Sequence, residues 1–131
     1  MRLLLDTDIC IAIMNRDERV RARLEATVPS QLRMSAITLA ELRFGIAKSD
    51  SARRATANLR VLQAKVATVP FDEAATLEYG ALREHLEQRG APIGLLDTLI
   101  AAHALSLKWT LVTHNTHEFR RVPGLKVQDW L

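Results

Sequence analysis

The sequence predicts an α/β sandwich, in which helices cover a central and mostly parallel β-sheet. Short apolar runs typical of buried strands alternate along the chain with longer segments of helical periodicity. This alternation is typical of parallel strands joined by right-handed helical crossovers. The 131 residues contain no internal repeat, linker or low-complexity segment, so a single domain over residues 1–131 is expected.

Five segments are expected to be strands. Leu3 to Leu5 is continuously apolar and too short for an amphipathic helix, which predicts a strand buried in the sheet. Gln31 to Ser35 alternates polar and apolar side chains, as a strand with one buried face does. The other three segments are Val66 to Phe71, Thr110 to Thr113 and, at a sheet edge, Lys126 to Gln128.

Helices are expected between these strands. Four of them are expected at residues 9–14, 17–26, 72–89 and 96–107. Another begins at Ser35 or Thr38 and ends near residue 49, and the next begins at residue 51. A turn or short helix is expected at 115–119. Asp72 is a favoured N-cap for the helix that should bury Leu77, Leu82 and Leu86. The segment from Leu96 to Leu107 is apolar on several sides and is expected to be central and well buried.

The composition is that of a soluble globular protein. Hydrophobic residues make up 48% of the chain and charged residues 25%, which excludes a disordered protein. No apolar run reaches the roughly eighteen residues of a membrane span, and the apolar start is too short for a signal peptide. The single cysteine, Cys10, predicts a buried thiol and a cytoplasmic location. A formal net charge of +3 permits a polyanionic partner without requiring one.

Three acidic residues stand in apolar surroundings, where an unpaired charge is unfavourable: Asp6, Glu41 and Asp97. Each alone has an ordinary explanation. Asp6 is a favoured helix cap, Asp97 is favoured by a helix dipole, and Glu41 can pair with Arg43. Together they favour an oxygen-ligand site for Mg²⁺ or Mn²⁺, and such a metal activates water for phosphodiester cleavage.

Four segments resemble, in order and spacing, the motifs of PIN-domain ribonucleases. They are Leu4 to Ile9, Ser35 to Gly45, Pro92 to Ala104 and Leu111 to Phe119. The chain resembles in particular the VapC-type toxins, the ribonuclease half of bacterial toxin–antitoxin pairs, over essentially its whole length. Four ordered motifs make a specific signal, whereas any one of them alone would be weak.

The resemblance implies a three-layer α/β/α fold, a homodimer, and a Mg²⁺ site held by Asp6, Glu41 and Asp97, with Mn²⁺ as a substitute. It implies a metal-dependent endoribonuclease that hydrolyses phosphodiester bonds of a structured RNA such as a tRNA and thereby inhibits translation. It also implies a VapB-type antitoxin, which joins the toxin in a hetero-oligomer and covers the acidic site with its C-terminal segment.

The chain departs from the family pattern at its fourth catalytic position, where Asp is frequent and Asn115 stands here. Asn can accept a hydrogen bond from a metal-bound water but adds no charge, so the second metal is in question more than the first. Glu118 is expected either to support the metal site or to be a surface charge. Asp8 replaces the usual Asn and is expected to cap or order its loop. Thr7 and Thr113 are expected to hold the acids through hydroxyl hydrogen bonds.

The histidines carry weaker functional signals. His103 lies six residues after Asp97 on one helix, so the two share no face, and a core or interface histidine is favoured over a general base. His114 and His117 are either RNA-phosphate contacts or solvated loop residues. The stretch from Arg16 to Arg23 is basic enough to follow a phosphate backbone.

Two other functions stay open from the residues alone. Asp6-Thr7-Asp8 after an apolar strand matches haloacid-dehalogenase-type phosphatases, in which Asp6 would be the nucleophile and Asp8 the general acid. The chain lacks the later Gly-Asp-x-x-x-Asp of that family and is short for its fold. Asn115, in place of a fourth acid, also leaves open a degenerate PIN domain that only binds RNA or a protein.

Overall fold

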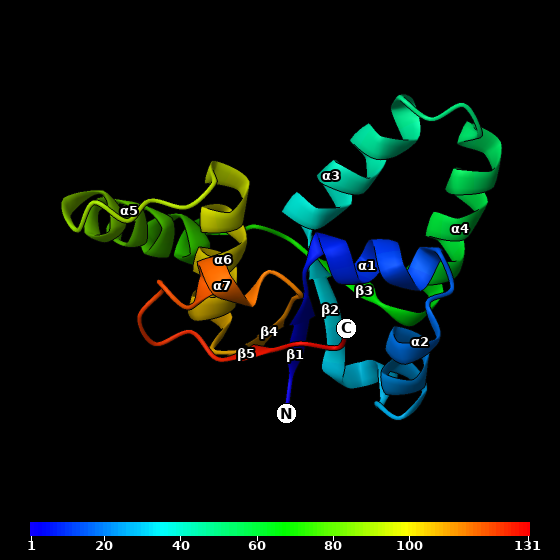
Figure 1. Ribbon diagram of the computed structural model, residues 1–131, viewed down its shortest axis with the longest axis horizontal. Helices are drawn as coiled ribbons and strands as arrows, with labels where there is room; N and C mark the ends of the chain where they lie inside the picture. The colour runs from blue at the N-terminus through cyan, green and yellow to red at the C-terminus, as the bar shows by residue number, and fades with distance from the viewer.

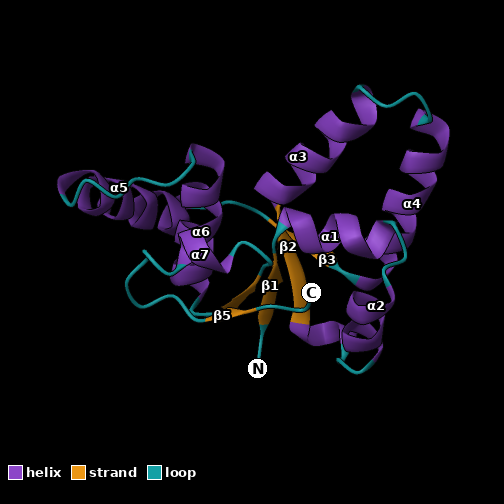
Figure 2. Ribbon diagram, viewed as in Figure 1, coloured by secondary structure: helices purple, strands orange, loops and turns teal.

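The computed structural model describes residues 1–131 and is built around one five-stranded sheet (Figures 1 and 2). The strands are β1 (Leu3–Leu5), β2 (Leu32–Ser35), β3 (Ala67–Val69), β4 (Thr110–Val112) and β5 (Val127–Gln128). Their order across the sheet is β3-β2-β1-β4-β5, and every neighbouring pair runs parallel. The predicted α/β class is therefore confirmed, with a sheet that is wholly parallel.

Helices cover both faces of this sheet. They are α1 (Thr7–Met14), α2 (Glu18–Glu25), α3 (Ala36–Ala47), α4 (Ala52–Lys65), α5 (Glu73–Gln88), α6 (Leu95–Leu107) and α7 (Thr116–Phe119), with a 3₁₀ turn at Pro29–Gln31. Figure 1 shows α1, α2 and α4 on one side of the sheet and α5, α6 and α7 on the other, which gives the three layers expected. The helix α3 leaves the sheet as an arm, and α4 returns beside it.

Each layer of helices packs on its own face of the sheet. Along β1, Leu3 and Leu5 join the core under α1, α2 and α4, whereas Leu4 joins the core under α5 and α6. This alternation follows from the two-residue period of a strand. Because β1 is buried on both faces and lies mid-sheet, the residue that follows it emerges at the centre of the sheet's carboxyl edge.

Two leucines of the second layer are more exposed than predicted. Leu77 on α5 is 75% exposed, since it lies five residues from Leu82, roughly 140° around the helix, and so faces away from α6. Leu96 is 48% exposed, because the first turn of α6 projects past the sheet edge (Figure 1). From Ile100 to Ala104 the helix is buried as expected.

Element boundaries differ from the predicted ones by a few residues. The helix α1 begins at Thr7 instead of residue 9, α6 begins at Leu95, and β3 is limited to Ala67–Val69. Asp72 caps α5 as predicted. None of the helices combines the length and apolar character that crossing a bilayer demands.

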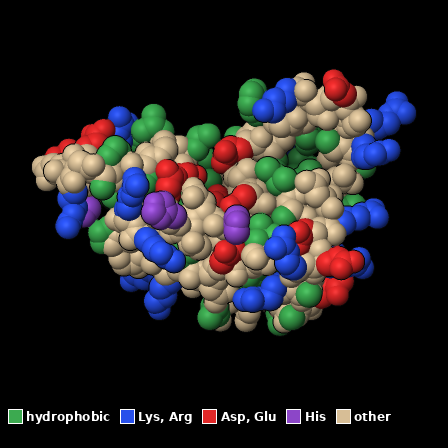
Figure 3. All heavy atoms as spheres, viewed as in Figure 1, with side chains coloured by type: hydrophobic (Ala, Val, Ile, Leu, Met, Phe, Trp, Pro, Cys, Tyr) green, Lys and Arg blue, Asp and Glu red, His purple; other side chains and the backbone are tan.

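The surface is hollowed where the two helical layers face each other beyond the carboxyl edge of the sheet. Figure 3 shows this hollow between the lobe of α5, α6 and α7 and the arm formed by α3 and α4. Asp and Glu side chains line its floor, and hydrophobic side chains lie along its rim. The parallel strands thus end at a concave and acidic surface.

Candidate active site

The predicted site residues lie at the carboxyl edge of the sheet. Asp6 directly follows β1, Glu41 lies on the helix that follows β2, and Asn115 lies three residues beyond β4. Asp97 is in the first turn of α6, at the same edge. Because β1, β2 and β4 are parallel neighbours, their carboxyl ends meet there, which is where open parallel sheets place their ligand sites.

Asp6 is both a helix cap and the most buried of these acids, with 5% of its surface exposed. Its Oδ1 accepts a hydrogen bond from the Thr7 amide at 2.8 Å, at the start of α1. Its Oδ2 accepts from the Thr113 hydroxyl at 2.8 Å, across the β1–β4 pair. The predicted capping role of Asp6 is therefore confirmed, and both of its oxygens are fixed by named donors, while its role as a metal ligand stays a prediction.

Glu41 is joined to Asp6 through Thr7. The Thr7 hydroxyl donates to Glu41 Oε1 at 2.7 Å, while its backbone amide binds Asp6. Thr38, one turn before Glu41 on α3, places its Oγ1 3.2 Å from that of Thr7. The alternative pairing of Glu41 with Arg43 is wrong, because Arg43 is exposed and makes no ion pair.

Asp97, Asn115 and Glu118 form the second half of the site. The Asn115 side-chain amide donates to Glu118 Oε2 at 3.0 Å and to Asp97 Oδ2 at 3.5 Å. The Asn115 backbone amide donates to the Thr113 hydroxyl at 3.0 Å, and that hydroxyl binds Asp6. Glu118 is thus a member of the acidic site and not an isolated surface charge. Whether it binds metal stays a prediction.

Burial and neighbouring acids raise the pKa of two of the carboxyls, Asp6 and Asp97. Burial raises the pKa of Asp6 to about 6, with further contributions from the charges of Asp8 and Glu41. Burial also raises the pKa of Asp97 to about 7, and a hydrogen bond with Glu118 and the charge of Asp6 act in the same direction. That hydrogen bond from Asp97 in turn lowers the pKa of Glu118.

No Lys, Arg or His forms an ion pair with Asp6, Glu41 or Asp97. The ion pairs involving Lys, Arg or His lie at Asp17, Glu25, Glu87 and Asp129, all outside the acidic site. Three neighbouring carboxylates without an ion-paired Lys or Arg are an arrangement that a divalent cation stabilises.

The oxygen ligands of the site suit a hard cation such as Mg²⁺, although the side chains lie too far apart to bind one ion directly. No three Asp, Glu, His or Cys side chains lie as close together as ligands of a single ion do. Carboxylate and amide oxygens are nevertheless the ligands that Mg²⁺ and Mn²⁺ prefer, and Mg²⁺ usually keeps several waters between itself and the protein. Asp6, Glu41, Asp97 and Asn115 supply such oxygens.

Asp8 orders the loop after β4, as expected. Its Oδ2 accepts from the His114 backbone amide at 3.0 Å and lies 3.5 Å from the Thr113 hydroxyl. The His114 ring is held in turn by Asp129, with Nδ1 3.1 Å from Oδ2. One oxygen of Asp8 is thus committed to the backbone, which does not favour the general acid of a phosphatase.

His103 is a core residue, as expected, and lies outside the acidic site. It is fully buried, and its Nδ1 lies 2.8 Å from the Ser35 hydroxyl. Burial lowers the pKa of this imidazole, so it is neutral at pH 7. Ser35 caps α3 through the Ile37 amide, so the pair connects α6 to the start of the helix that carries Glu41.

Sequence reasoning missed Thr38 and Ser35. Thr38 lies three residues before Glu41, and residues at that spacing share a helix face, so the helical pattern contained a usable signal. The contact between Ser35 and His103 joins residues 68 positions apart, and no local pattern could have predicted it.

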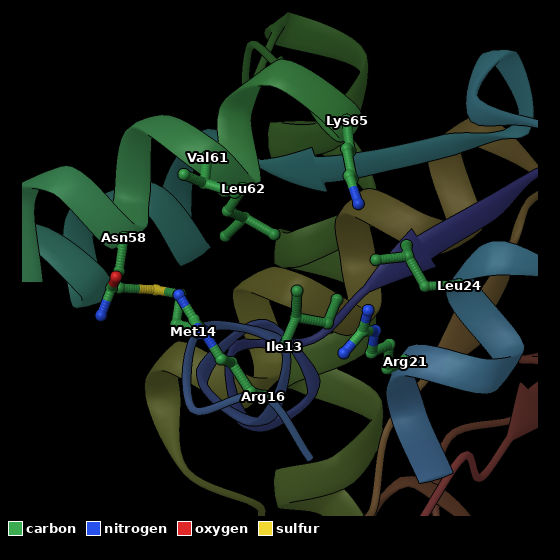
Figure 4. A pocket seen from close by; sticks show the side chains of 9 residues that line it. All are labelled: Ile13, Met14, Arg16, Arg21, Leu24, Asn58, Val61, Leu62 and Lys65. Atoms are coloured by element: carbon green, nitrogen blue, oxygen red, sulfur yellow. The ribbon is translucent and has the colours of Figure 1, made fainter. Parts of the chain in front are cut away.

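A separate cavity of about 230 Å³ lies between α1, α2 and α4 (Figure 4). It is lined by apolar and basic side chains: Ile13, Met14, Arg16, Arg21, Leu24, Asn58, Val61, Leu62 and Lys65. None of the predicted catalytic residues lines this cavity. The acidic site is therefore an open surface feature and not part of this apolar pocket.

Comparison with known proteins agrees with the resemblance of the motifs. The PIN domain family model matches residues 3–125. The chain is 35% identical to the tRNA(fMet)-specific endonuclease VapC of Salmonella typhimurium over 131 residues, covering 99% of this chain and 98% of that protein. It is 36% identical to Ribonuclease VapC2 of Rickettsia felis over 132 residues, with the same coverage.

The fold agrees equally closely with solved structures. The structure of VapBC2 from Rickettsia felis bound to a promoter DNA fragment contains a chain with a TM-score of 0.95 and 35% identity, and each chain is fully covered. DNA-bound VapBC from Salmonella typhimurium gives a TM-score of 0.94 at 35% identity, covering 100% of this chain and 99% of that one. The chain therefore belongs to the PIN domain family and, within it, to the VapC ribonucleases.

Proposed function

We propose that this chain is the toxin of a toxin–antitoxin pair and acts as a metal-dependent endoribonuclease. The observation that carries the proposal is the group of carboxylates without an ion-paired Lys or Arg at the sheet edge. Asp6, Glu41 and Asp97 come from three separate elements, and hydrogen bonds from Thr7, Thr113 and Asn115 orient them there. Relatives that share the whole length of the chain are named as ribonucleases.

Asp6, Glu41 and Asp97 would hold Mg²⁺, with Mn²⁺ as a substitute. When bound, the cation supplies an activated water and stabilises the charge that develops on the phosphate. Asn115 and Glu118 stand beside Asp97 and would support the same site. Asn115 brings an oxygen but no charge, so the proposal requires only one metal ion.

The chain's own contribution is to hold the carboxylates in place. Thr113 donates to Asp6 and Thr7 donates to Glu41, so each hydroxyl fixes the position of one acid. The Asn115 amide does the same for Glu118 and Asp97. Partners of this kind fix the ligands and usually contribute tenfold to a hundredfold to activity or metal affinity.

The substrate and partner follow from the family. A structured RNA such as a tRNA is the proposed substrate, since one relative is named as a tRNA(fMet)-specific endonuclease. A VapB-type antitoxin is the proposed partner, since the similar solved structures are VapBC complexes. A homodimer and a toxin–antitoxin hetero-oligomer are proposed as the assembly. Cleavage of a tRNA would account for inhibition of translation.

The central test is cleavage of RNA by the purified protein. A tRNA pool should be cut in the presence of Mg²⁺ and left intact with EDTA. Asp6→Ala and Asp97→Ala should abolish cleavage, whereas Asp8→Ala should retain a measurable rate. Equal loss in Asp8→Ala, with faster hydrolysis of a phosphomonoester, would favour a phosphatase. Binding of RNA without Mg²⁺-dependent cleavage would favour a non-catalytic PIN domain.

The toxin role has its own test in cells. Expression of the chain alone should arrest growth, and co-expression of an antitoxin encoded beside it should relieve the arrest. The Asp97→Ala variant serves as the matched control, because it should be harmless when expressed at the same level. A folded wild-type protein with no effect on growth would contradict the toxin role.

A further inference from the structure

A second polar cavity, of about 350 Å³, lies between the end of α5 and the segment that follows α7. It is lined by His85, Leu86, Arg89, Ala91, Arg120, Arg121 and Pro123. Its wall therefore contains three arginines and a histidine but no Asp or Glu. Figure 3 shows Lys, Arg and His side chains on the lobe of α5 and α7, beside the acidic side chains of the hollow.

The arginines of this cavity are not used in ion pairs. Arg89, Arg120 and Arg121 are exposed, and none of them pairs with a carboxylate. Arg121 donates to the Pro92 carbonyl oxygen at 3.0 Å, which holds its guanidinium at the cavity. His85 also lines the cavity, with its Nε2 buried away from solvent. The cavity thus offers several donors to an anion.

Both walls of the cavity lead directly into the acidic site. Arg120 and Arg121 follow α7, the helix that carries Glu118. On the other wall, the chain runs from Arg89 through Ala91 to α6, which carries Asp97 in its first turn. The chain thus connects the cavity to the acidic site over two residues on one wall, from Glu118 to Arg120, and over eight on the other, from Arg89 to Asp97.

An ordinary explanation covers only one of the three arginines. Arg89 and His85 lie at the C-terminal end of α5, where a positive charge is favoured by the helix dipole. Arg120 and Arg121 come from a different segment, and that explanation does not account for their position on the same cavity.

We propose that this cavity binds a backbone phosphate of the RNA next to the one that is cleaved. The inference rests on the proposed function, because it assigns a contact to the same substrate. Guanidinium groups donate to phosphate oxygens in a bidentate manner, and arginine keeps its charge at any physiological pH. Such a contact positions the strand without reading its sequence.

The test compares two double variants that remove the same charge. Arg89→Gln/Arg120→Gln removes two cavity arginines and leaves Arg121 on Pro92. Arg53→Gln/Arg54→Gln removes two exposed arginines of α4, which do not line the cavity. Binding of a fluorescent single-stranded RNA is measured in EDTA over a range of salt concentrations.

The cavity variant should bind RNA about tenfold more weakly at physiological salt, and its plot of log K against log salt should be shallower by about 0.7 per lost phosphate contact. The α4 variant should stay within about twofold of the wild type. Equal losses in the two variants, or no loss in the cavity variant, would overturn the proposal. Unchanged RNA affinity with weaker antitoxin binding would assign the cavity to the protein partner instead.

Cleavage kinetics separate this inference from the proposed function. The cavity variant should raise KM for RNA and leave kcat within about twofold, since the acids are intact. Normal cleavage with an unchanged KM would overturn the inference and keep the nuclease. If the wild-type protein does not cleave RNA but the cavity variant still binds RNA more weakly than the wild type, the phosphate site is kept and the nuclease function is rejected.

Discussion

The acidic site and the basic cavity are neighbours along the chain, yet they are held in place in different ways. In the acidic site, Asp6 is 5% exposed and both of its oxygens accept hydrogen bonds. In the cavity, Arg89 and Arg120 are exposed and make no side-chain hydrogen bond to a carboxylate. The first region is fixed before a ligand binds, whereas the second can adapt to a flexible strand.

This difference is consistent with the two tasks. Catalysis depends on the placement of charge to a fraction of an ångström, which needs buried and hydrogen-bonded groups. Attraction of a polyanion depends mainly on the number of cations nearby and tolerates mobile side chains. Single changes in the acidic site should therefore cost much more than single changes in the cavity, and the following predictions test this contrast.

The largest effect is expected from Asp97→Asn. This change removes a proposed ligand charge and should lower the rate of RNA cleavage by roughly 10²–10³-fold. Glu118→Gln is the matched control, because it removes a charge from the adjacent side chain that Asn115 also contacts. It should lower the rate by about tenfold or less. Initial rates at saturating Mg²⁺ measure the effect of each variant. Equal losses in Asp97→Asn and Glu118→Gln would indicate that Glu118 binds the metal as Asp97 does.

A second prediction concerns stability against pH in the presence of EDTA. The pKa of Asp6 is raised to about 6 from 3.8, so the folded state binds this proton more tightly than the unfolded chain does. The resulting stability is fully present below about pH 4 and is lost as the pH rises through 6. At pH 8, ionised Asp6 therefore costs about 3 kcal/mol, and Asp97, with its pKa raised to about 7, acts in the same direction.

Asp6→Asn should remove this cost. Its melting temperature should exceed that of the wild type by about 10 °C at pH 8 and by roughly half as much at pH 5. Asp17→Asn is a useful contrast, because a hydrogen bond from Arg19 lowers the pKa of that exposed carboxyl. It should bring no gain at pH 8. If the difference in melting temperature between Asp6→Asn and the wild type does not change with pH, burial does not raise the pKa of the Asp6 carboxyl.

The sequence was sufficient to place Asp6, Glu41 and Asn115 at one edge of the sheet, because each of them comes after the end of a strand. A buried strand such as Leu3–Leu5 must deliver Asp6 to the sheet edge, and the parallel order brings Glu41 and Asn115 to that edge as well. Thr7 and Thr113 also lie beside strand ends, and the parallel pairing of β1 with β2 and β4 brings their hydroxyls to Glu41 and Asp6.

The basic cavity could not be predicted in the same way. It depends on the meeting of two loops, one after α5 and one after α7, and neither loop has a periodic pattern that fixes its path. The exposure of Leu77 was missed for a related reason, since its helix has apolar residues on more than one face and only packing decides which face is buried. Tertiary contact, and not local preference, determines both features.

A third prediction tests the hydroxyl that connects β4 to β1. Thr113→Val removes the donor to Asp6 and the acceptor of the Asn115 amide while keeping the side-chain shape. Activity at limiting Mg²⁺ should fall roughly tenfold to a hundredfold. Thr113→Ser keeps the hydroxyl and should stay within about threefold of the wild type. Similar losses in both variants would point to packing of the threonine methyl group instead of the hydrogen bond.

The smallest effect is expected from Asn115→Asp. A further unit charge at about 4 Å from a divalent cation contributes about 2 kcal/mol in water-like surroundings, so half-maximal activity should need roughly thirtyfold less Mg²⁺. The rate at saturating Mg²⁺ should change little, which makes this the smallest effect on the maximal rate. In EDTA the same variant should be less stable than the wild type, because the amide that now donates to Asp97 and Glu118 becomes a repelling carboxylate. Titration of activity with Mg²⁺ and thermal melting in EDTA measure the two effects. An unchanged Mg²⁺ requirement would place residue 115 outside the reach of the metal, and the site would then rest on Asp6, Glu41 and Asp97 alone.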